Sequence, residues 1–298
     1  MDTPVLSIKG LTKRYGKITA VDNLHLDIGK GQVFGILGPN GSGKTTTLGT
    51  VLGVTQPTAG SFSWFGNIPT KDDRKRIGSI LEMPVFYPYL TGHRNLALIA
   101  KIKGIDEATI EEKLDAVGLL DRKDSPYRTY SYGMKQRLAI ASALLGEPEV
   151  MILDEPTNGL DPKGIAEIRQ LITRIAQTGM TIIMASHILD EVQKICTHVA
   201  VLEKGKKLFA GSVDEVLNQA STLEISSDDM AALKIALGNS PLIASFSEDW
   251  DKYILKVNEN VTATDINRWM HEHGIVLRHL NIRKKTLENY FLELLDKS

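Results

Sequence analysis

A glycine-rich segment directly after a short apolar run most constrains what this chain can fold into. Residues 38–45 read Gly-Pro-Asn-Gly-Ser-Gly-Lys-Thr, between an apolar run at residues 33–37 and a helical pattern that begins near Lys44. They match the pattern G-x-x-x-x-G-K-[S/T], in which glycines let backbone N–H groups converge on phosphates. The alternative is a glycine-rich turn without a ligand, but the flanking strand and helix favour the phosphate site. The residues expected to contact the phosphates are Gly38, Pro39, Asn40, Gly41, Ser42, Gly43, Lys44, Thr45 and Thr46.

A second apolar run ends in two adjacent carboxylates. Residues 150–153 are Val-Met-Ile-Leu, and Asp154 and Glu155 follow them. Neighbouring residues of a strand point to opposite sides, so the two carboxylates are expected to face different surroundings. We expect Asp154 to hold Mg²⁺ together with the Thr45 hydroxyl, and Glu155 to polarise the water that attacks the γ-phosphate. An acidic pair after a strand is often only a solvated strand end, but a neighbouring phosphate site favours the catalytic interpretation.

The spacing of apolar residues predicts an α/β fold with two kinds of sheet. Residues 24–28 alternate between apolar and polar, which is typical of a half-buried antiparallel strand. Residues 33–37, 150–153 and 180–185 are continuous apolar runs, which are typical of buried parallel strands with crossover helices. Residues 91–146 are mainly helical in pattern. We therefore predict a mixed α/β core with an antiparallel subdomain and a helical insertion.

The pattern changes after Gly211. Residues 222–281 predict the order β-α-β-β-α-β, which suits a ferredoxin-like unit, and a last helix is expected at residues 286–295. We place the division at residue 220. Residues 1–220 are then a nucleotide-binding domain, and residues 221–298 a small α+β accessory domain.

Composition and charge narrow the classes of function. The 35 basic and 36 acidic side chains leave a formal charge of −1, so we expect no nucleic-acid partner. The single cysteine, Cys196, cannot form an internal disulfide, and the N-terminal residues lack the apolar core of a signal peptide, which indicates a reducing cytoplasm. The longest apolar stretches are far shorter than the about 20 residues that cross a bilayer as a helix. A membrane role would therefore need a partner chain.

Four further segments carry a resemblance to the nucleotide-binding domain of ATP-binding cassette (ABC) ATPases, over residues 4–220. Residues 130–137, Tyr-Ser-Tyr-Gly-Met-Lys-Gln-Arg, resemble the signature motif; residues 156–161, Pro-Thr-Asn-Gly-Leu-Asp, resemble the D-loop. Residues 185–187, Ala-Ser-His, resemble the switch histidine, and Tyr15, which we place ahead of the first strand pair, resembles the aromatic residue that stacks on adenine. Each alone has a structural alternative: a helix cap, a surface histidine or a half-buried tyrosine. Their joint order identifies the chain as a member of this family.

Two motifs depart from the family pattern. Glu82 stands where the family normally has a glutamine that touches both Mg²⁺ and the membrane subunit. A carboxylate can still coordinate Mg²⁺ but cannot donate a hydrogen bond, and the alternative is that Glu82 is only solvated. The signature has Tyr132 and Met134 where glycine and glutamine are commonest, while Ser131 and Gly133 remain.

The resemblance implies an ATPase that works as a homodimer. Two chains packed head to tail would close each ATP between the phosphate site of one and the signature of the other, so that ATP joins the subunits and hydrolysis releases them. Its cofactors would be ATP and Mg²⁺. The expected functional residues are Lys44, Glu155 and His187 for catalysis; Tyr15, residues 38–46, Ser131, Gly133 and Asp161 for ATP; and Thr45, Glu82 and Asp154 for the metal.

The segment at residues 82–91 and the small C-terminal domain make the chain similar to single-cassette subunits of exporters for bacitracin-type antibiotics, lantibiotics or sodium. This implies an integral membrane permease on a separate chain and a peripheral location at the cytoplasmic face of the membrane. An exposed pair, Phe86 and Tyr87, is expected to form a loop that receives a helix of the permease. The alternative is a soluble ABC ATPase not tied to transport. A cassette that only binds ATP would lack Glu155 or His187.

Overall fold

The structure is a computed structural model of the 298-residue chain. It forms two compact units, Met1–Ser212 and Val213–Ser298, which are described separately. In the described part of the chain, no helix is both long and apolar enough to cross a membrane. The domain boundary predicted between residues 220 and 221 falls outside the described residues and stays a prediction. The described residues are 3–82, 86–218, 222–258, 261–283, 287–288 and 290–291.

An antiparallel sheet forms near the N-terminus, as predicted. It has the order β2-β1-β4. The alternating residues Leu24, Leu26 and Ile28 turn one face of β2 inward, and all three are buried. They pair across the sheet with buried apolar residues of β1, which include Leu6 opposite Ile28. The strands are β1 (Leu6–Tyr15), β2 (Ile18–Ile28) and β4 (Ala59–Trp64).

A second sheet has the order β5-β6-β7-β3-β8-β9, in which only the edge strand β9 is antiparallel to its neighbour. Every residue of β3, β6 and β7 is buried, which explains their continuous apolar runs. The carboxyl ends of these three strands meet at one edge, where Leu37 lies opposite Ser186 and Asp154 opposite Ala185. The strands are β3 (Val33–Leu37), β5 (Ile77–Ile80), β6 (Val150–Asp154), β7 (Thr181–Ser186), β8 (His198–Glu203) and β9 (Lys206–Ser212).

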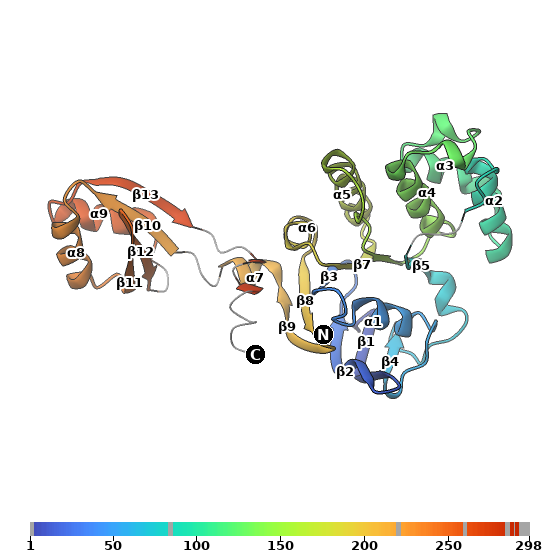
Figure 1. Ribbon diagram of the computed structural model, residues 1–298, viewed down its shortest axis with the longest axis horizontal. Coiled ribbons are helices and arrows are strands. Elements are labelled where there is room, and N and C mark those ends of the chain that lie inside the picture. The colour runs from blue at the N-terminus through green and yellow to red at the C-terminus, as the bar shows by residue number, and fades with distance from the viewer. Residues whose placement is uncertain are drawn as a thin grey trace. The chain divides into compact units, whose positions relative to one another are not determined.

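Helices connect these strands, and the predicted helical insertion is present as α2, α3 and α4, which group together (Figure 1). Threonine, serine and aspartate side chains begin three of the helices: Thr91 caps α2, Ser131 caps α4 and Asp161 caps α5. The helices of this unit are α1 (Lys44–Val51), α2 (Gly92–Lys103), α3 (Ile110–Ala116), α4 (Tyr132–Leu144), α5 (Pro162–Gln177) and α6 (Leu189–Ile195).

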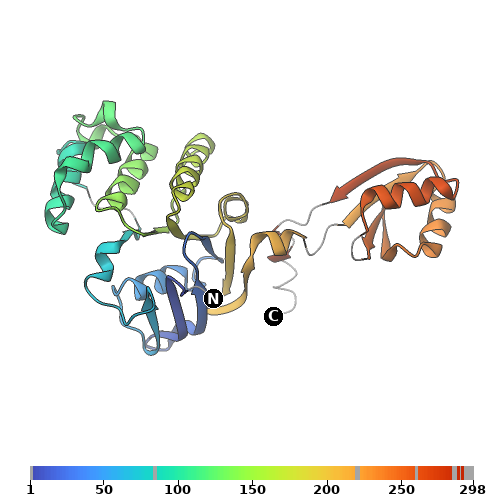
Figure 2. The ribbon, with the colours of Figure 1, turned by 180° about the vertical axis from the view of Figure 1, so that it is seen from behind.

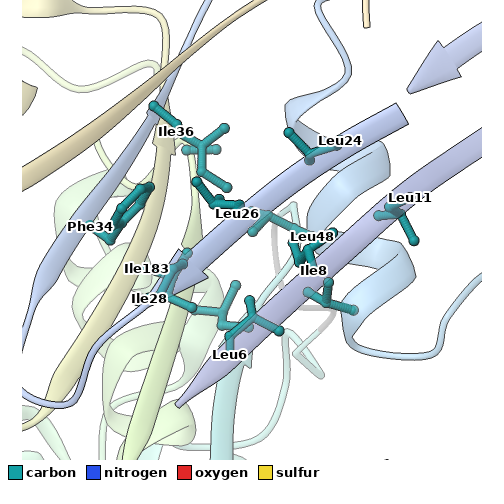
Figure 3. Packing of buried hydrophobic residues seen from close by; sticks show 14 of the residues in the cluster. Leu6, Ile8, Leu11, Leu24, Leu26, Ile28, Phe34, Ile36, Leu48 and Ile183 are labelled. Carbon is teal, nitrogen blue, oxygen red and sulfur yellow. The ribbon is translucent and has the colours of Figure 1, made fainter. Parts of the chain in front are cut away.

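One apolar core joins the two sheets of this unit (Figure 3). Leu48 of α1 packs in the same cluster as Ile8 of β1, Leu26 of β2 and Ile36 of β3. Burial of each such side chain stabilises the fold by about 1.5–3 kcal/mol. The packing therefore fixes α1, and with it the loop before α1, between the antiparallel sheet and the end of β3.

Residues 222–283 of the C-terminal unit, coloured orange to red in Figure 2, have the predicted order β-α-β-β-α-β, and α7 precedes them. Its sheet has the order β11-β12-β10-β13 with every pair antiparallel, which is the ferredoxin-like arrangement. Its core is its own, with Leu223, Leu255, Ile266 and others fully buried. The helix expected at residues 286–295 lies largely outside the described residues. The elements are α7 (Val213–Asn218), β10 (Thr222–Ser227), α8 (Met230–Asn239), β11 (Ile243–Asp249), β12 (Lys252–Val257), α9 (Ala263–Glu272) and β13 (Leu277–Arg283).

Candidate active site

The glycine-rich loop lies between β3 and α1 and has no room for side chains at two of its glycines. A Cβ on Gly38 would lie 2.3 Å from the Leu202 carbonyl oxygen, and one on Gly43 would lie 2.4 Å from the Ala20 carbonyl oxygen. Gly43 also has φ +101°, a conformation that residues with a side chain rarely adopt. The Gly38 N–H donates to the Ser186 carbonyl oxygen at 3.3 Å, which links the loop to the end of β7.

Lys44 begins α1 with an almost fully buried side chain, 5% exposed. Its Nζ donates to the carbonyl oxygens of Gly38 at 2.7 Å and Pro39 at 3.2 Å. The same Nζ forms an ion pair with Oε1 of Glu155 at 3.3 Å. Carbonyl groups of the glycine-rich loop and the Glu155 carboxylate therefore surround the Lys44 ammonium group.

Glu155 is the first residue after β6 and lies between Lys44 and His187. Its Oε2 is 2.8 Å from Nδ1 of His187, while its backbone N–H donates to the Ala185 carbonyl oxygen at 3.0 Å. The backbone of Glu155 is left-handed, with φ +49°. For a non-glycine residue this conformation is strained by roughly 1–3 kcal/mol, and such strain concentrates at active sites.

Asp154 is buried, and one of its oxygens is available for a ligand. Its Oδ1 has no hydrogen-bond partner among the described residues, and its carboxyl accepts a hydrogen bond from Thr45. Burial raises the pKa of the Asp154 carboxyl, and the charges of Glu155 and Glu82 raise it further, while Thr45 and Lys44 oppose this. A buried carboxylate beside a hydroxyl is a donor set that Mg²⁺ accepts when phosphates and water supply its other ligands.

The third predicted metal ligand, Glu82, lies near Asp154. Within the described ranges, no group of three or more histidine, cysteine, aspartate or glutamate side chains is arranged to hold a metal ion. Glu82 follows β5, has an exposed side chain and a left-handed backbone with φ +57°, and is close enough to affect Asp154 electrostatically. Residues 83–85, the next in the chain, lie outside the described residues.

An open hollow adjoins the glycine-rich loop and collects most of the predicted phosphate residues. The sequence pattern did not predict four of its lining residues, Ile18, Thr19, Ala20 and Lys204. Lys204 comes from the turn between β8 and β9, and the other three come from β2. The hollow is lined by Ile18, Thr19, Ala20, Asn40, Gly41, Gly43, Lys44, Thr45, Thr46, Glu155 and Lys204.

Tyr15 lies elsewhere than predicted. It is the last residue of β1, paired with Ile18, so the expectation that it precedes the first strand pair is wrong. Its side chain is 50% exposed, and the Lys13 ammonium lies 4.9 Å from the centre of its ring. Ile18, rather than Tyr15, is among the residues that line the hollow, and the role of Tyr15 in stacking on adenine stays a prediction.

Ser131 and Asp161 are helix caps, and the described lining of the hollow includes neither them nor Gly133. Ser131 Oγ accepts from the Met134 N–H at 3.3 Å, and Asp161 Oδ1 accepts from the Gly164 N–H at 2.9 Å. Tyr132 of the signature lies beside the D-loop of its own chain, where a Cβ on Gly159 would lie 3.4 Å from its ring. Gly133 lies in the first turn of α4.

The pair Phe86 and Tyr87 is only half exposed, which corrects the expectation of an exposed pair. Phe86 is 6% exposed and packs with its ring centre 5.1 Å from that of Tyr127. Tyr87 has a half-exposed side chain, and its backbone N–H donates to Oδ1 of the buried Asn95 at 2.8 Å. Apolar burial and a buried amide therefore fix this loop.

Comparisons with known proteins agree with this geometry. The family described as ABC transporter matches residues 21–158. The bacitracin transport ATP-binding protein BcrA of Enterococcus faecalis is 37% identical over 300 residues, which cover 98% of this chain and 96% of that protein. The lantibiotic transport ATP-binding protein SrtF of Streptococcus pyogenes is 40% identical over 210 residues, covering 70% of this chain and 92% of that protein.

Solved structures resemble the same part of the chain. A structure of the ATP-binding subunit of an ABC transporter has a TM-score of 0.64 and 30% identity, over 72% of this chain and 92% of its own. The dimeric, post-hydrolysis state of the ATP-binding cassette MJ0796 bound to ADP and Pi has a TM-score of 0.62 and 26% identity, over 70% of this chain and 98% of its own.

Proposed function

The chain belongs to the ATP-binding subunits of ABC transporters, and on this premise we propose that ATP-driven closure of its homodimer powers a permease on a separate chain. The family assignment makes the protein an ATP-binding ATPase with relatives of the bacitracin and lantibiotic transport type. The steps that link ATP to transport are the proposal.

The described geometry suits hydrolysis of ATP at the glycine-rich loop. Backbone N–H groups within residues 40–46 and the N-terminus of α1 would bind the phosphates, and Lys44 would neutralise the β- and γ-phosphate oxygens. Glu155 would accept a proton from the attacking water, and His187, in contact with Glu155, would contact the γ-phosphate. Asp154, Thr45 and Glu82 would hold Mg²⁺, which supplies charge neutralisation of the phosphates when bound.

One observation carries the homodimer: Ser131 and Gly133 do not line the hollow of their own chain in the described residues. A phosphate site open on one side leaves the γ-phosphate in contact with bulk water. A second copy packed head to tail would place its Ser131 and Gly133 over that open side and exclude water. The relative MJ0796 has been seen as a dimer with ADP and Pi.

The transported compound is proposed from the relatives. BcrA and SrtF are named for bacitracin and lantibiotic transport, so we assign a peptide antibiotic of that class as the exported compound. Because no described helix can span a membrane, the permease would be a separate chain, with this subunit at its cytoplasmic face. A soluble ABC ATPase remains the competing function, and it predicts ATPase activity that a permease and an antibiotic leave unchanged.

Mixing two inactive variants tests the shared site. Lys44→Ala removes the phosphate lysine, and Ser131→Arg blocks the signature, so neither homodimer has a complete site. A mixed dimer has one complete site, formed by Lys44 of one chain and Ser131 of the other. Mixing should therefore restore ATPase activity to about a quarter of the wild-type value by random pairing. A mixture no more active than its parts would contradict the homodimer.

A second experiment detects the closed state. Glu155→Gln keeps the shape of the side chain but removes the proton acceptor, so this variant should bind ATP, fail to turn it over and accumulate as a dimer in gel filtration. A variant that stays monomeric at saturating ATP would count against closure. Reconstitution with a permease in vesicles should then raise the wild-type ATPase rate when a peptide antibiotic is added, and an unchanged rate would favour the soluble alternative.

A further inference from the structure

A buried carboxyl group lies beside the site and has no part in the roles assigned above. Glu191, on α6, is 1% exposed. Its Oε2 accepts a hydrogen bond from the Thr157 hydroxyl at 2.6 Å and a longer one from the Ser186 hydroxyl at 3.5 Å. Its Oε1 is buried without a hydrogen-bond partner among the described residues. Burial raises the pKa of this carboxyl, and the Thr157 hydrogen bond opposes the shift.

The two hydroxyls that Glu191 holds belong to the segments that carry Glu155 and His187. Thr157 is two residues after Glu155, and Ser186 immediately precedes His187. Ser186 Oγ also accepts from the Ile188 N–H at 3.0 Å, which closes the turn around His187. Glu191 therefore joins the loop after β6 to the loop after β7, just where their side chains meet.

The site needs such a link because regular sheet pairing ends here. Among the described residues, the last backbone hydrogen bond between the two segments runs from the Glu155 N–H to the Ala185 carbonyl oxygen. Beyond it, Glu155 holds a left-handed backbone that persists only where neighbouring contacts enforce it. The 2.6 Å bond between Thr157 and Glu191 is a contact of this kind, and a hydrogen bond to a carboxylate is roughly twice as strong as one between neutral groups.

Burial of a carboxyl group with one unbonded oxygen lowers the stability of the fold, so stability alone does not explain the presence of Glu191. A buried polar atom without a partner costs about 1–3 kcal/mol. Arg169 of α5 lies near enough to influence the Glu191 carboxyl electrostatically, yet its own Nε is also buried and unbonded in the described structure. An apolar side chain would fill the same space without this cost, which points to a role in the site rather than in the core.

We propose that Glu191 is a positioning residue for ATP hydrolysis, which holds Thr157 and Ser186 together so that Glu155 and His187 meet above Lys44. This inference rests on the catalytic roles proposed for Glu155 and His187. It places no contact between Glu191 and ATP. Loss of the link should therefore lower kcat, because a small misplacement of a catalytic group slows the reaction by up to about a hundredfold, while ATP binding at the glycine-rich loop is kept.

Substitutions at both ends of the link test the proposal. Glu191→Ala removes the acceptor, and Thr157→Val removes the donor with little change in shape; each should lower kcat by about 10- to 100-fold, with KM for ATP within about threefold. Glu191→Gln and Thr157→Ser keep the hydrogen bond and should stay within about threefold of the wild type. The double variant Glu191→Ala/Thr157→Val should be no slower than the slower single variant, because both remove one interaction.

The chain offers a matched control in a second buried carboxylate. Asp73 accepts a 2.7 Å hydrogen bond from the Thr70 hydroxyl, and neither residue lines the hollow in the described structure. Thr70→Val removes a bond of the same kind and should leave kcat unchanged. Thermal unfolding sets a temperature at which every variant is folded, so a loss of structure is not read as a loss of catalysis.

Two results would overturn the role of Glu191. The first is a kcat of Thr157→Val equal to that of Thr70→Val. The second is an equal loss of kcat in Glu191→Gln and Glu191→Ala, because the acceptor remains in the former. Failure of the homodimer is seen separately, in the mixing of Lys44→Ala with Ser131→Arg. Binding of a fluorescent ATP analogue, measured on each variant, confirms that the phosphate site is intact.

Discussion

Nδ1 of His187 lies 2.8 Å from Oε2 of Glu155, so the residues that follow two neighbouring parallel strands share one direct contact. The other oxygen of the same carboxylate forms the ion pair with Lys44. A single side chain thus connects the histidine after β7 to the lysine that begins α1. Both partners therefore contact the carboxylate that would receive the proton from water.

The contact predicts a catalytic role for the histidine. His187→Ala should lower kcat by about 10²- to 10³-fold, because Glu155 loses the partner that orients its carboxylate, and it should change ATP affinity much less. Steady-state kinetics with a coupled phosphate assay measure both values. His25→Ala, a change of an exposed histidine on β2, is the control and should leave both unchanged. A kcat of His187→Ala near the control value would remove His187 from the mechanism.

The carboxylate at position 82 gives a second prediction. Glu82→Gln should keep ATPase activity, because an amide oxygen can still bind Mg²⁺, whereas Glu82→Ala should raise the Mg²⁺ concentration needed for half-maximal activity. Titration of Mg²⁺ at fixed ATP measures this. If Glu82→Ala shows the wild-type titration and unchanged transport, Glu82 is only a solvated side chain.

Asp73 predicts a dependence of stability on pH. Hydrogen bonds from the side chain and backbone of Thr70 hold the pKa of the Asp73 carboxyl below its usual range. A lowered pKa stabilises the fold above the pKa of the unfolded chain, about 3.9, and this stabilisation is lost as the pH falls through the folded pKa. Thr70→Val should therefore lower the free energy of unfolding by about 1 kcal/mol at neutral pH and by less in acid. Urea denaturation at both pH values measures the difference, and an equal loss at both would contradict it.

The separate core of the C-terminal unit gives a fourth prediction. Leu255 is fully buried in that core, so Leu255→Ala should lower the free energy of unfolding of this unit by about 2–5 kcal/mol. Because the nucleotide site lies in the other unit, kcat and KM for ATP should stay at wild-type values below the unfolding temperature. Leu48→Ala, under the glycine-rich loop, is the contrasting variant and should affect both stability and kinetics. Altered kinetics in Leu255→Ala would show that the units are coupled.

Local patterns in the sequence predicted much of the fold. Alternation at residues 24–28 predicted the antiparallel strand, because a strand buried on one face has an apolar residue at every second position. Continuous apolar runs predicted β3, β6 and β7, because these strands are buried on both faces. The glycine-rich loop was predicted from another local pattern, because the spacing of its glycines reflects the backbone geometry that phosphates require.

Other features depend on contacts between distant segments. Lys204 and Ile18 reach the hollow because the sheets pack around α1, and no local pattern reports this packing. Phe86 was expected at the surface, yet Tyr127 covers it from another part of the helical group. Glu191 lies in a short polar sequence on α6 and resembles any solvated acid until Thr157 is seen beside it. The expected ATP roles of Tyr15, Ser131, Gly133 and Asp161 stay predictions.

The crowding around Gly38 and Gly43 has a consequence for affinity. Carbonyl oxygens of Leu202 and Ala20, from two different strands, occupy the space beside Gly38 and Gly43 that a side chain would need, so the surrounding strands leave this loop little free space. Ordering of the loop is therefore part of folding, and nucleotide binding does not have to offset the entropy that ordering the loop would cost. The affinity of the loop for ATP should therefore depend little on loop flexibility and strongly on the strands that surround the loop.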